Sequence, residues 1–178
     1  VLFADPEARP PASELRRVCA EAAAEYAEEI RQTRGLSVED YAAKIREADE
    51  WGDVLEARML MERRFPKVRL VIWNLEQGFS VSVGDDGAPG VAHIVHTGSH
   101  FDPLADVDAD GALQCGVFAR DDAEAQAAVE AAVAAMAPRH AKHMRCDECG
   151  EVLRSNAAAQ NHMELTDHVF FSEVTLEG

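Results

Sequence analysis

The sequence is short of positive charge, and this shortage excludes whole classes of partner. Only 17 lysine and arginine residues stand against 33 aspartate and glutamate residues, which gives the 178-residue chain a formal net charge of -16. The field of such a chain repels nucleic-acid phosphates and anionic lipids. We therefore expect neither nucleic acid nor a membrane as a partner.

Long apolar runs and clustered cysteines are also scarce. No stretch approaches the roughly 18 apolar residues that span a bilayer, and the sequence opens at Val1 without a signal-peptide pattern. The missing initiator methionine suggests that residues upstream were removed or not included. Of the four cysteines, only Cys146 and Cys149 lie close together, in a spacing that favours a metal site over a disulfide framework. We expect a reducing compartment, the cytoplasm.

The first third of the chain has helical periodicity. Apolar residues recur at helical spacing from Ser13, a possible N-cap, to Gly35, a possible stop. A second helix begins at Ser37, which lies three residues before Asp40 in a variant of the capping box. A third begins at Asp53, after Trp51 and Gly52 interrupt the pattern.

The period changes after Pro66. The segments "KVRLVIW", "FSVSV", "VAHIVH" and "LQCGVFA" have the apolar and β-branched pattern of strands. A long alanine-rich helix then begins near Asp121 or Asp122, and Pro138 is expected to end it. Helices followed by a mostly antiparallel sheet predict an α+β fold. We expect an αβ domain over residues 1–120, a connecting helix over 121–143 and a small module over 144–178.

That small module carries a metal-binding pattern. Two residues separate Cys146 from Cys149, twelve residues separate Cys149 from His162, and five residues separate His162 from His168. Two thiolates and two imidazoles supply the four ligands that zinc takes in a C2H2 finger, without a large apolar core. The sequence predicts one structural zinc ion per chain, with these four residues as its ligands.

A C2H2 finger often binds DNA, but the charge of this one argues against that function. Residues 144–178 contain two basic and seven acidic side chains. Phosphate contacts supply most non-specific affinity for DNA, and this finger has few cations with which to make them. A protein-binding or stabilising role is favoured.

The segment "SHFDPL" contains a candidate catalytic pair. If the segment is extended, His100 and Asp102 point to the same face, because side chains alternate along a strand. An aspartate that accepts from one ring nitrogen leaves the other nitrogen to take a proton from a nucleophile. On its own the pattern is weak, because most isolated histidines near strand ends are structural.

The nucleophile for this pair is harder to find. Ser99 is adjacent to His100 and faces the opposite way. Cys19 lies on the apolar face of a helix, where burial raises a thiol pKa, and Cys115 lies in a predicted strand; both read as core residues. Cys146 and Cys149 are assigned to zinc.

Taken in order, four segments resemble the ovarian-tumour (OTU) family of deubiquitinases, in the branch that ends in a C2H2 finger. They are "SVEDYAAKIREADEWGDVLEARML", "VRLVIWN", "GSHFDPL" and the finger ending "TDHVFFSEV". The resemblance implies a papain-like cysteine protease fold and a thioesterase and isopeptidase that removes ubiquitin from conjugates and polyubiquitin chains. It implies that His100 is the general base and Asp102 its orienting partner.

The same resemblance places the nucleophilic cysteine in an Asp-x-x-Cys motif at a helix start, upstream of the segment matching Val1 onward. No such motif occurs in this sequence, so we expect the 178 residues alone to be inactive. The resemblance also implies ubiquitin and polyubiquitin as partners. Association with the ATPase Cdc48/p97 would run through an N-terminal region that has no counterpart here.

Two other interpretations remain open. The first is a non-catalytic ubiquitin-binding or scaffold protein on the same fold. The second, which the charge count disfavours, is a zinc-finger protein that binds nucleic acid.

Overall fold

The computed structural model describes residues 10–50, 52–98, 100–107, 109–110, 113–140, 143–153 and 156–174. Trp51 and Ser99, considered above, lie outside these residues. The chain divides into two compact units. One contains the described residues up to Leu70 together with Ser82–Ala92 and Ala105–Arg120, and the other contains Val71–Val81, His93–Leu104 and the described residues from Asp121 onward.

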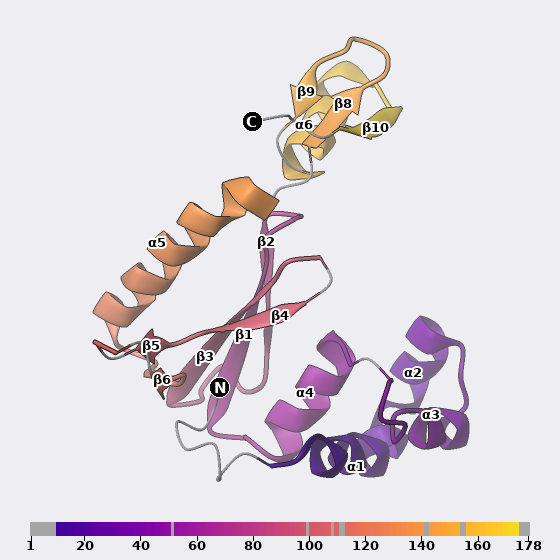
Figure 1. Cartoon of the computed structure of the whole chain (residues 1–178). Helices are drawn as coiled ribbons and strands as arrows, with labels where there is room; N and C mark the ends of the chain where they lie inside the picture. Colours follow the sequence, from indigo (N-terminus) through magenta and orange to yellow (C-terminus); the bar gives the residue numbers. More distant parts are fainter. Residues whose placement is uncertain are drawn as a thin grey trace. The chain divides into compact units, whose positions relative to one another are not determined.

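The first unit begins with helices. Their bounds are α1 Ala12–Ala22, the 3-10 helix η2 Ala23–Tyr26, α2 Ala27–Arg34, α3 Val38–Lys44 and α4 Val54–Arg63 (Figure 1). The single helix predicted from Ser13 is thus interrupted by a tighter turn, and Pro11, not Ser13, occupies the N-cap position of α1.

The other predicted helix boundaries are confirmed. Gly35 ends α2 in the left-handed conformation, with φ 66°, which glycine adopts without a steric penalty. Ser37 caps α3 by accepting a hydrogen bond from the Asp40 amide. Asp53 and Glu56 form a reciprocal capping box at the start of α4.

These helices enclose the apolar core of the first unit. The buried residues that form it are Cys19, Ala20, Ala22, Ala23, Ile30, Tyr41, Ile45, Leu55 and Met59. In this set the residues of α1 are small and those of α3 and α4 are larger.

A mixed sheet carries the candidate catalytic pair. Its strands are β1 Val68–Asn74, β2 Phe79–Val83, β3 Gly90–His96, β4 Phe101–Leu104 and β7 Phe118–Ala119. The order is β2-β1-β3-β4 (Figure 1). Strand β7 also pairs with β3. A separate ribbon joins β5 Asp106–Val107 to β6 Leu113–Cys115. The predicted strand "LQCGVFA" is therefore two short strands.

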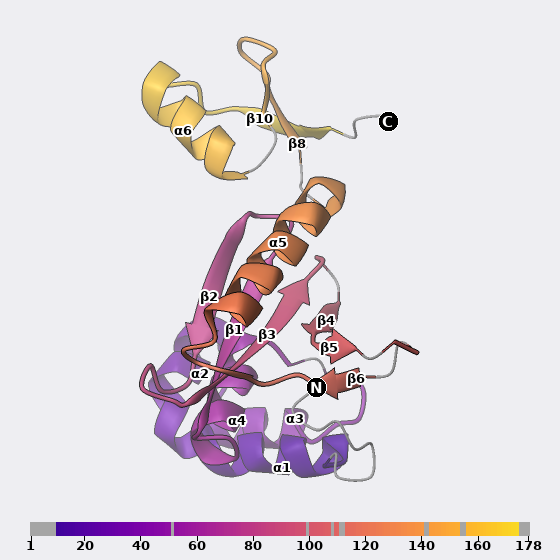
Figure 2. The same ribbon diagram turned by 90° about the vertical axis from the view of Figure 1, so that its left-hand side faces the viewer.

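Helix α5 Ala123–His140 follows the sheet in the chain (Figure 2). The Asp122 side chain accepts a hydrogen bond from the Ala125 amide at 2.9 Å, which confirms the predicted cap. The prediction that Pro138 ends the helix is wrong, because α5 continues to His140. A proline in the last turn removes one backbone donor and strains one turn, which the end of a long helix tolerates. No helix in the described parts of the chain has the length and apolar content to cross a bilayer.

The C-terminal module contains β8 His143–Cys146, β9 Val152–Leu153, α6 Asn156–Thr166 and β10 Phe171–Val174. The three strands form an antiparallel sheet in the order β10-β8-β9. Figures 1 and 2 both draw α6 beside this small sheet. The predicted domain boundaries at residues 120 and 143 stay predictions.

Candidate active site and metal centre

One hairpin presents both members of the candidate catalytic pair. Strands β3 and β4 are antiparallel, with Val95 opposite Asp102. The Thr97 amide closes the turn by donating to the His100 carbonyl at 3.0 Å. His100 therefore lies at the end of the turn and Asp102 two residues later, on the strand. The His100 Nε2 atom lies 3.7 Å from the Asp102 Oδ1 atom.

Both side chains are open to solvent. The exposed fraction is 67% for the His100 side chain and 54% for that of Asp102. A separation of 3.7 Å is longer than a direct hydrogen bond, but a small side-chain rotation would close it, and such contacts often tighten only when substrate binds. The predicted pair is thus adjacent and accessible. Its catalytic role stays a prediction.

The turn that carries His100 is also supported from the end of β1. The Leu75 amide donates to the His96 carbonyl at 3.0 Å. Gly98 has a φ of 98°, and a side chain at this position would collide with the Glu76 carboxylate.

None of the three thiols that the structure describes is placed to attack a substrate. Cys19 is 2% exposed and its sulfur lies 3.8 Å from the Glu56 carbonyl oxygen. Burial, and to a smaller extent the Glu56 carboxylate, raises the pKa of the Cys19 thiol to about 11. Cys146 and Cys149 belong to the cluster described next, and the side chain of Cys115 lies outside the described residues.

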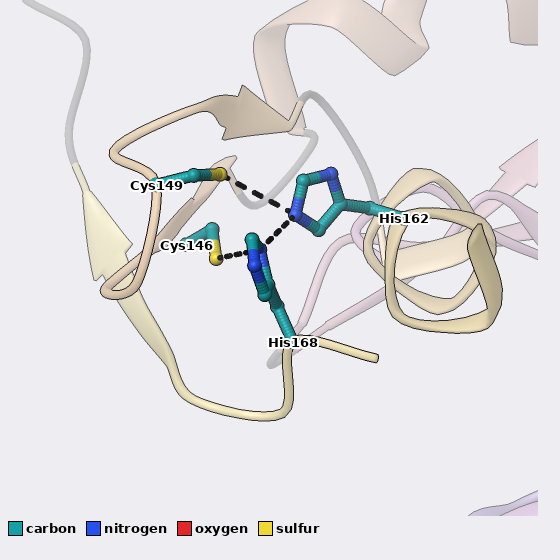
Figure 3. Close-up of side chains that lie close together, drawn as sticks. All are labelled: Cys146, Cys149, His162 and His168. Atoms are coloured by element: carbon teal, nitrogen blue, oxygen red, sulfur yellow. Dashed lines mark hydrogen bonds between the residues drawn. The ribbon is translucent and has the colours of Figure 1, made fainter. Parts of the chain in front are cut away.

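The four predicted metal ligands converge (Figure 3). Cys146 ends β8, Cys149 lies in the following turn, His162 projects from α6, and His168 lies in the loop before β10. The Cys146 Sγ atom is 3.5 Å from His168 Nδ1, and the Cys149 Sγ atom is 3.5 Å from His162 Nε2. The two imidazole nitrogens are 3.2 Å apart.

These separations suit a tetrahedral ion. With metal–sulfur bonds of about 2.3 Å and metal–nitrogen bonds of about 2.0 Å, tetrahedral ligand atoms lie roughly 3.3 to 3.8 Å apart. All four ligand atoms fall within 4.8 Å of one another. The residues are therefore positioned to hold a metal ion.

A carboxylate that sequence reasoning missed orients one ligand. Glu151 Oε2 lies 3.1 Å from His162 Nδ1, so it can accept the proton on that nitrogen and leave Nε2 free for a metal. The Phe171 ring packs edge-on against the His162 ring, with centroids 6.0 Å apart. These contacts fix the ring in the direction of the two sulfurs.

Comparisons with known proteins agree on one fold. No protein-family model matches the chain. The chain is 25% identical over 147 residues to a "Ubiquitin thioesterase OTU1" of Drosophila pseudoobscura pseudoobscura and 29% identical over 148 residues to one of Xenopus laevis. Each match covers 79% of this chain, and 40% and 48% of the respective relative. This chain thus spans less than half the length of these curated relatives.

A viral protein and a solved structure are also similar. The chain is 32% identical over 97 residues to the RNA-directed RNA polymerase L of Crimean-Congo hemorrhagic fever virus, a match that covers 51% of this chain and 2% of that protein. An ovarian-tumour (OTU) domain solved in complex with ubiquitin superposes with a TM-score of 0.60 and 16% identity, over 72% of each chain. The α+β fold predicted from the sequence is therefore confirmed as an OTU fold.

Proposed function

We propose that this chain, a member of the OTU family, is the base-bearing part of a cysteine-type deubiquitinase. The proposed reaction is hydrolysis of the bond between the C-terminus of ubiquitin and a lysine or thiol of a conjugate, polyubiquitin included. The observation that carries the proposal is the accessible His100–Asp102 pair on one hairpin of an OTU fold. The relatives named as ubiquitin thioesterases and the OTU domain bound to ubiquitin support the choice of substrate.

The geometry supports a separate role for each ring nitrogen of His100 in the proposed proton transfer. His100 presents Nε2 to Asp102, so Asp102 accepts the proton on Nε2 and Nδ1 takes the proton of the attacking thiol. The thiolate adds to the carbonyl carbon, and Nδ1 returns the proton to the departing amine as the carbon–nitrogen bond breaks. Water then attacks the thioester carbonyl while His100 Nδ1 removes one of its protons. The carbon–sulfur bond breaks, His100 returns that proton to the sulfur, and ubiquitin leaves with a free C-terminal carboxylate.

The proposal requires a thiol beyond those that the structure describes. Cys19 is buried, and Cys146 and Cys149 face each other in the metal cluster. We propose, as the family resemblance implies, that the nucleophile comes from residues that precede Val1 in the intact protein and not from Cys115, whose side chain the structure does not describe. The 178-residue chain alone is then expected to show no turnover of ubiquitin that carries a C-terminal fluorophore.

The decisive experiment compares variants of the protein that carries its nucleophile. Without the imidazole the thiol is largely protonated near neutral pH and no acid reaches the leaving group, so His100→Ala should lower kcat/KM by about 100-fold or more. Asp102→Asn should cost less, because Asp102 orients the ring. Asp106→Asn, which removes another exposed carboxylate from β5, is the matched control and should leave kcat/KM unchanged. Full activity of His100→Ala would refute the mechanism.

The position of the described thiols also favours a second candidate, a ubiquitin-binding protein without catalysis. Turnover of ubiquitin conjugates distinguishes the two candidates. A scaffold binds ubiquitin without turnover even when the upstream residues are present. For the metal cluster we propose one structural zinc ion per chain. Association with Cdc48/p97 stays a prediction from the family resemblance, and a cytoplasmic location stays a prediction from the cysteine pattern.

A further inference from the structure

The C-terminal finger exposes an unusual share of apolar side chains. Among the described residues, seven large hydrophobic side chains are exposed, and five of these lie in the finger: Val152, Met163, Leu165, Val169 and Phe170. Leu165, Val169 and Phe170 are 76%, 57% and 67% exposed. Single exposed apolar residues are normal on a protein surface, whereas large contiguous apolar patches mark interaction sites. Leu165, Val169 and Phe170 lie within six consecutive residues. We call these three residues the finger surface.

Carboxylates border the finger surface. The Val169 amide donates to Glu148 Oε1 at 2.8 Å, and the Asp147 amide donates to the Phe170 carbonyl at 2.9 Å. The segment thus lies against the acidic turn between Cys146 and Cys149. The exposed acidic residues of the described finger are Asp147, Glu148, Glu151, Glu164, Asp167 and Glu173, and Arg145 is its one lysine or arginine within the described residues.

Metal binding and the finger surface depend on the same segment. His168, a predicted ligand, stands immediately before Val169 and three residues after Leu165. Asp167 turns the chain there with a φ of 59°. A bound metal would therefore hold the backbone that carries the three side chains of the finger surface, and removal of the metal should leave these side chains without a fixed arrangement.

The sign of the charge selects the partner. Phosphate-bearing partners and a second copy of this chain, at -16, both present negative charge to the acidic border. The occupant must instead offer an apolar face bordered by lysine or arginine. Ubiquitin, whose surface lysines are the points of chain extension, meets the charge requirement.

We propose that the finger surface binds a ubiquitin unit of the substrate other than the unit whose C-terminal carbonyl reaches His100. This inference rests on the proposed function for its choice of partner. It makes the finger a second substrate-binding site, which favours chains over a single ubiquitin because two linked contacts raise the effective concentration of each.

The first experiment measures binding and needs no nucleophile. Fluorescent tetraubiquitin is titrated with the zinc-loaded 178-residue chain. Leu165→Ser and Phe170→Ser should each weaken binding about tenfold or more, as expected for central apolar contacts. Val107→Ser removes a 58% exposed apolar side chain from β5 and is the matched control. Metal content must stay at one ion per chain in all variants, and a chelator should abolish binding by the unaltered chain.

Two results would overturn the inference. One is tetraubiquitin binding that neither finger variant changes. The other is a dimer of this chain, detected by sedimentation, that Phe170→Ser dissociates, because a second copy would then be the occupant.

The second experiment separates this inference from the proposed function. In the protein with its nucleophile, Phe170→Ser should lower kcat/KM for tetraubiquitin and leave cleavage of single ubiquitin bearing a fluorophore unchanged. Equal cleavage of tetraubiquitin by both forms would refute the inference alone. Failure of the unaltered enzyme to cleave either substrate would refute the proposed function and leave the binding result standing.

Discussion

Cys19 offers a direct test of which thiol can act in this protein. The raised pKa of about 11 compares with 9.0 for a free thiol on the same scale. At pH 8 the thiolate fraction is then roughly one in a thousand in the folded chain and roughly one in ten in the unfolded chain. Because the thiolate is the reactive form, we expect iodoacetamide to modify Cys19 at least about 100-fold more slowly in the folded protein than in the unfolded protein. Cys19 is also only 2% exposed, and this shielding should slow the reaction further.

The assay is mass spectrometry of the peptide that contains Cys19, after labelling at pH 8 with and without urea. A Cys19→Ser variant gives the background from other thiols. Glu56→Gln should speed labelling slightly, because the Glu56 carboxylate is the second cause of the raised pKa whereas its backbone carbonyl, which faces the sulfur, is retained. Labelling of folded Cys19 at the unfolded rate would refute its place in the core and make it a candidate nucleophile.

The same shift has a consequence for stability. The pKa of Cys19 is higher in the folded chain, so the unfolded chain loses its proton first as the pH rises. The protonated Cys19 thiol therefore makes its full contribution to the free energy of unfolding below pH 9. This contribution decreases between about pH 9 and 11, by roughly 2 to 3 kcal/mol in total. Urea unfolding at pH 8.5 and 10.5, with Cys19→Ser as the control for other titrating groups, measures it.

Two further predictions concern the metal and the buried carboxylate. Cys146→Ser should release the metal, measured by elemental analysis, and unfold the finger without a change in the melting of the helical unit; retained metal would contradict the ligand set. Glu151→Gln should keep the fold and weaken metal affinity about 10- to 100-fold, because His162 loses its orienting acceptor. Glu56→Ala should lower the free energy of unfolding by about 3 kcal/mol, because it leaves the buried hydroxyl of Tyr41 without the carboxylate that accepts its hydrogen bond at 2.7 Å. Tyr41→Phe should lower the free energy of unfolding by only about 1 kcal/mol. Equal losses in the two variants would contradict this account.

Features set by neighbouring residues could be predicted from the sequence. The metal ligands follow from a fixed spacing, and the spacing of His100 and Asp102 from strand alternation. Gly35 and Asp53 mark helix ends through backbone preferences that act within four residues. Such signals are local, so they can be read before any tertiary contact is known.

Features set by distant residues could not be predicted. The tighter turn at Ala23–Tyr26 follows an alanine-rich stretch whose helical preference gives no sign of an interruption. Glu76 meets Gly98 only because β1 and β3 are neighbours in the sheet, and Glu151 meets His162 only because the finger folds. Helix α5 continues past Pro138 because this proline lies in the last turn of the helix, and the residue type alone does not reveal that position.

The β3–β4 hairpin also limits how this protein could be regulated. Imidazole and carboxylate are borne two residues apart on one short ribbon, so a rigid displacement of the helices or the finger leaves their separation unchanged. Under the proposed function, control over turnover would then have to act on delivery of the sulfur or of the scissile carbonyl to the His100 ring. An inhibitor or partner that slows the proposed reaction from a remote surface should accordingly change substrate or thiol placement, and leave the pairing of His100 with Asp102 as it is.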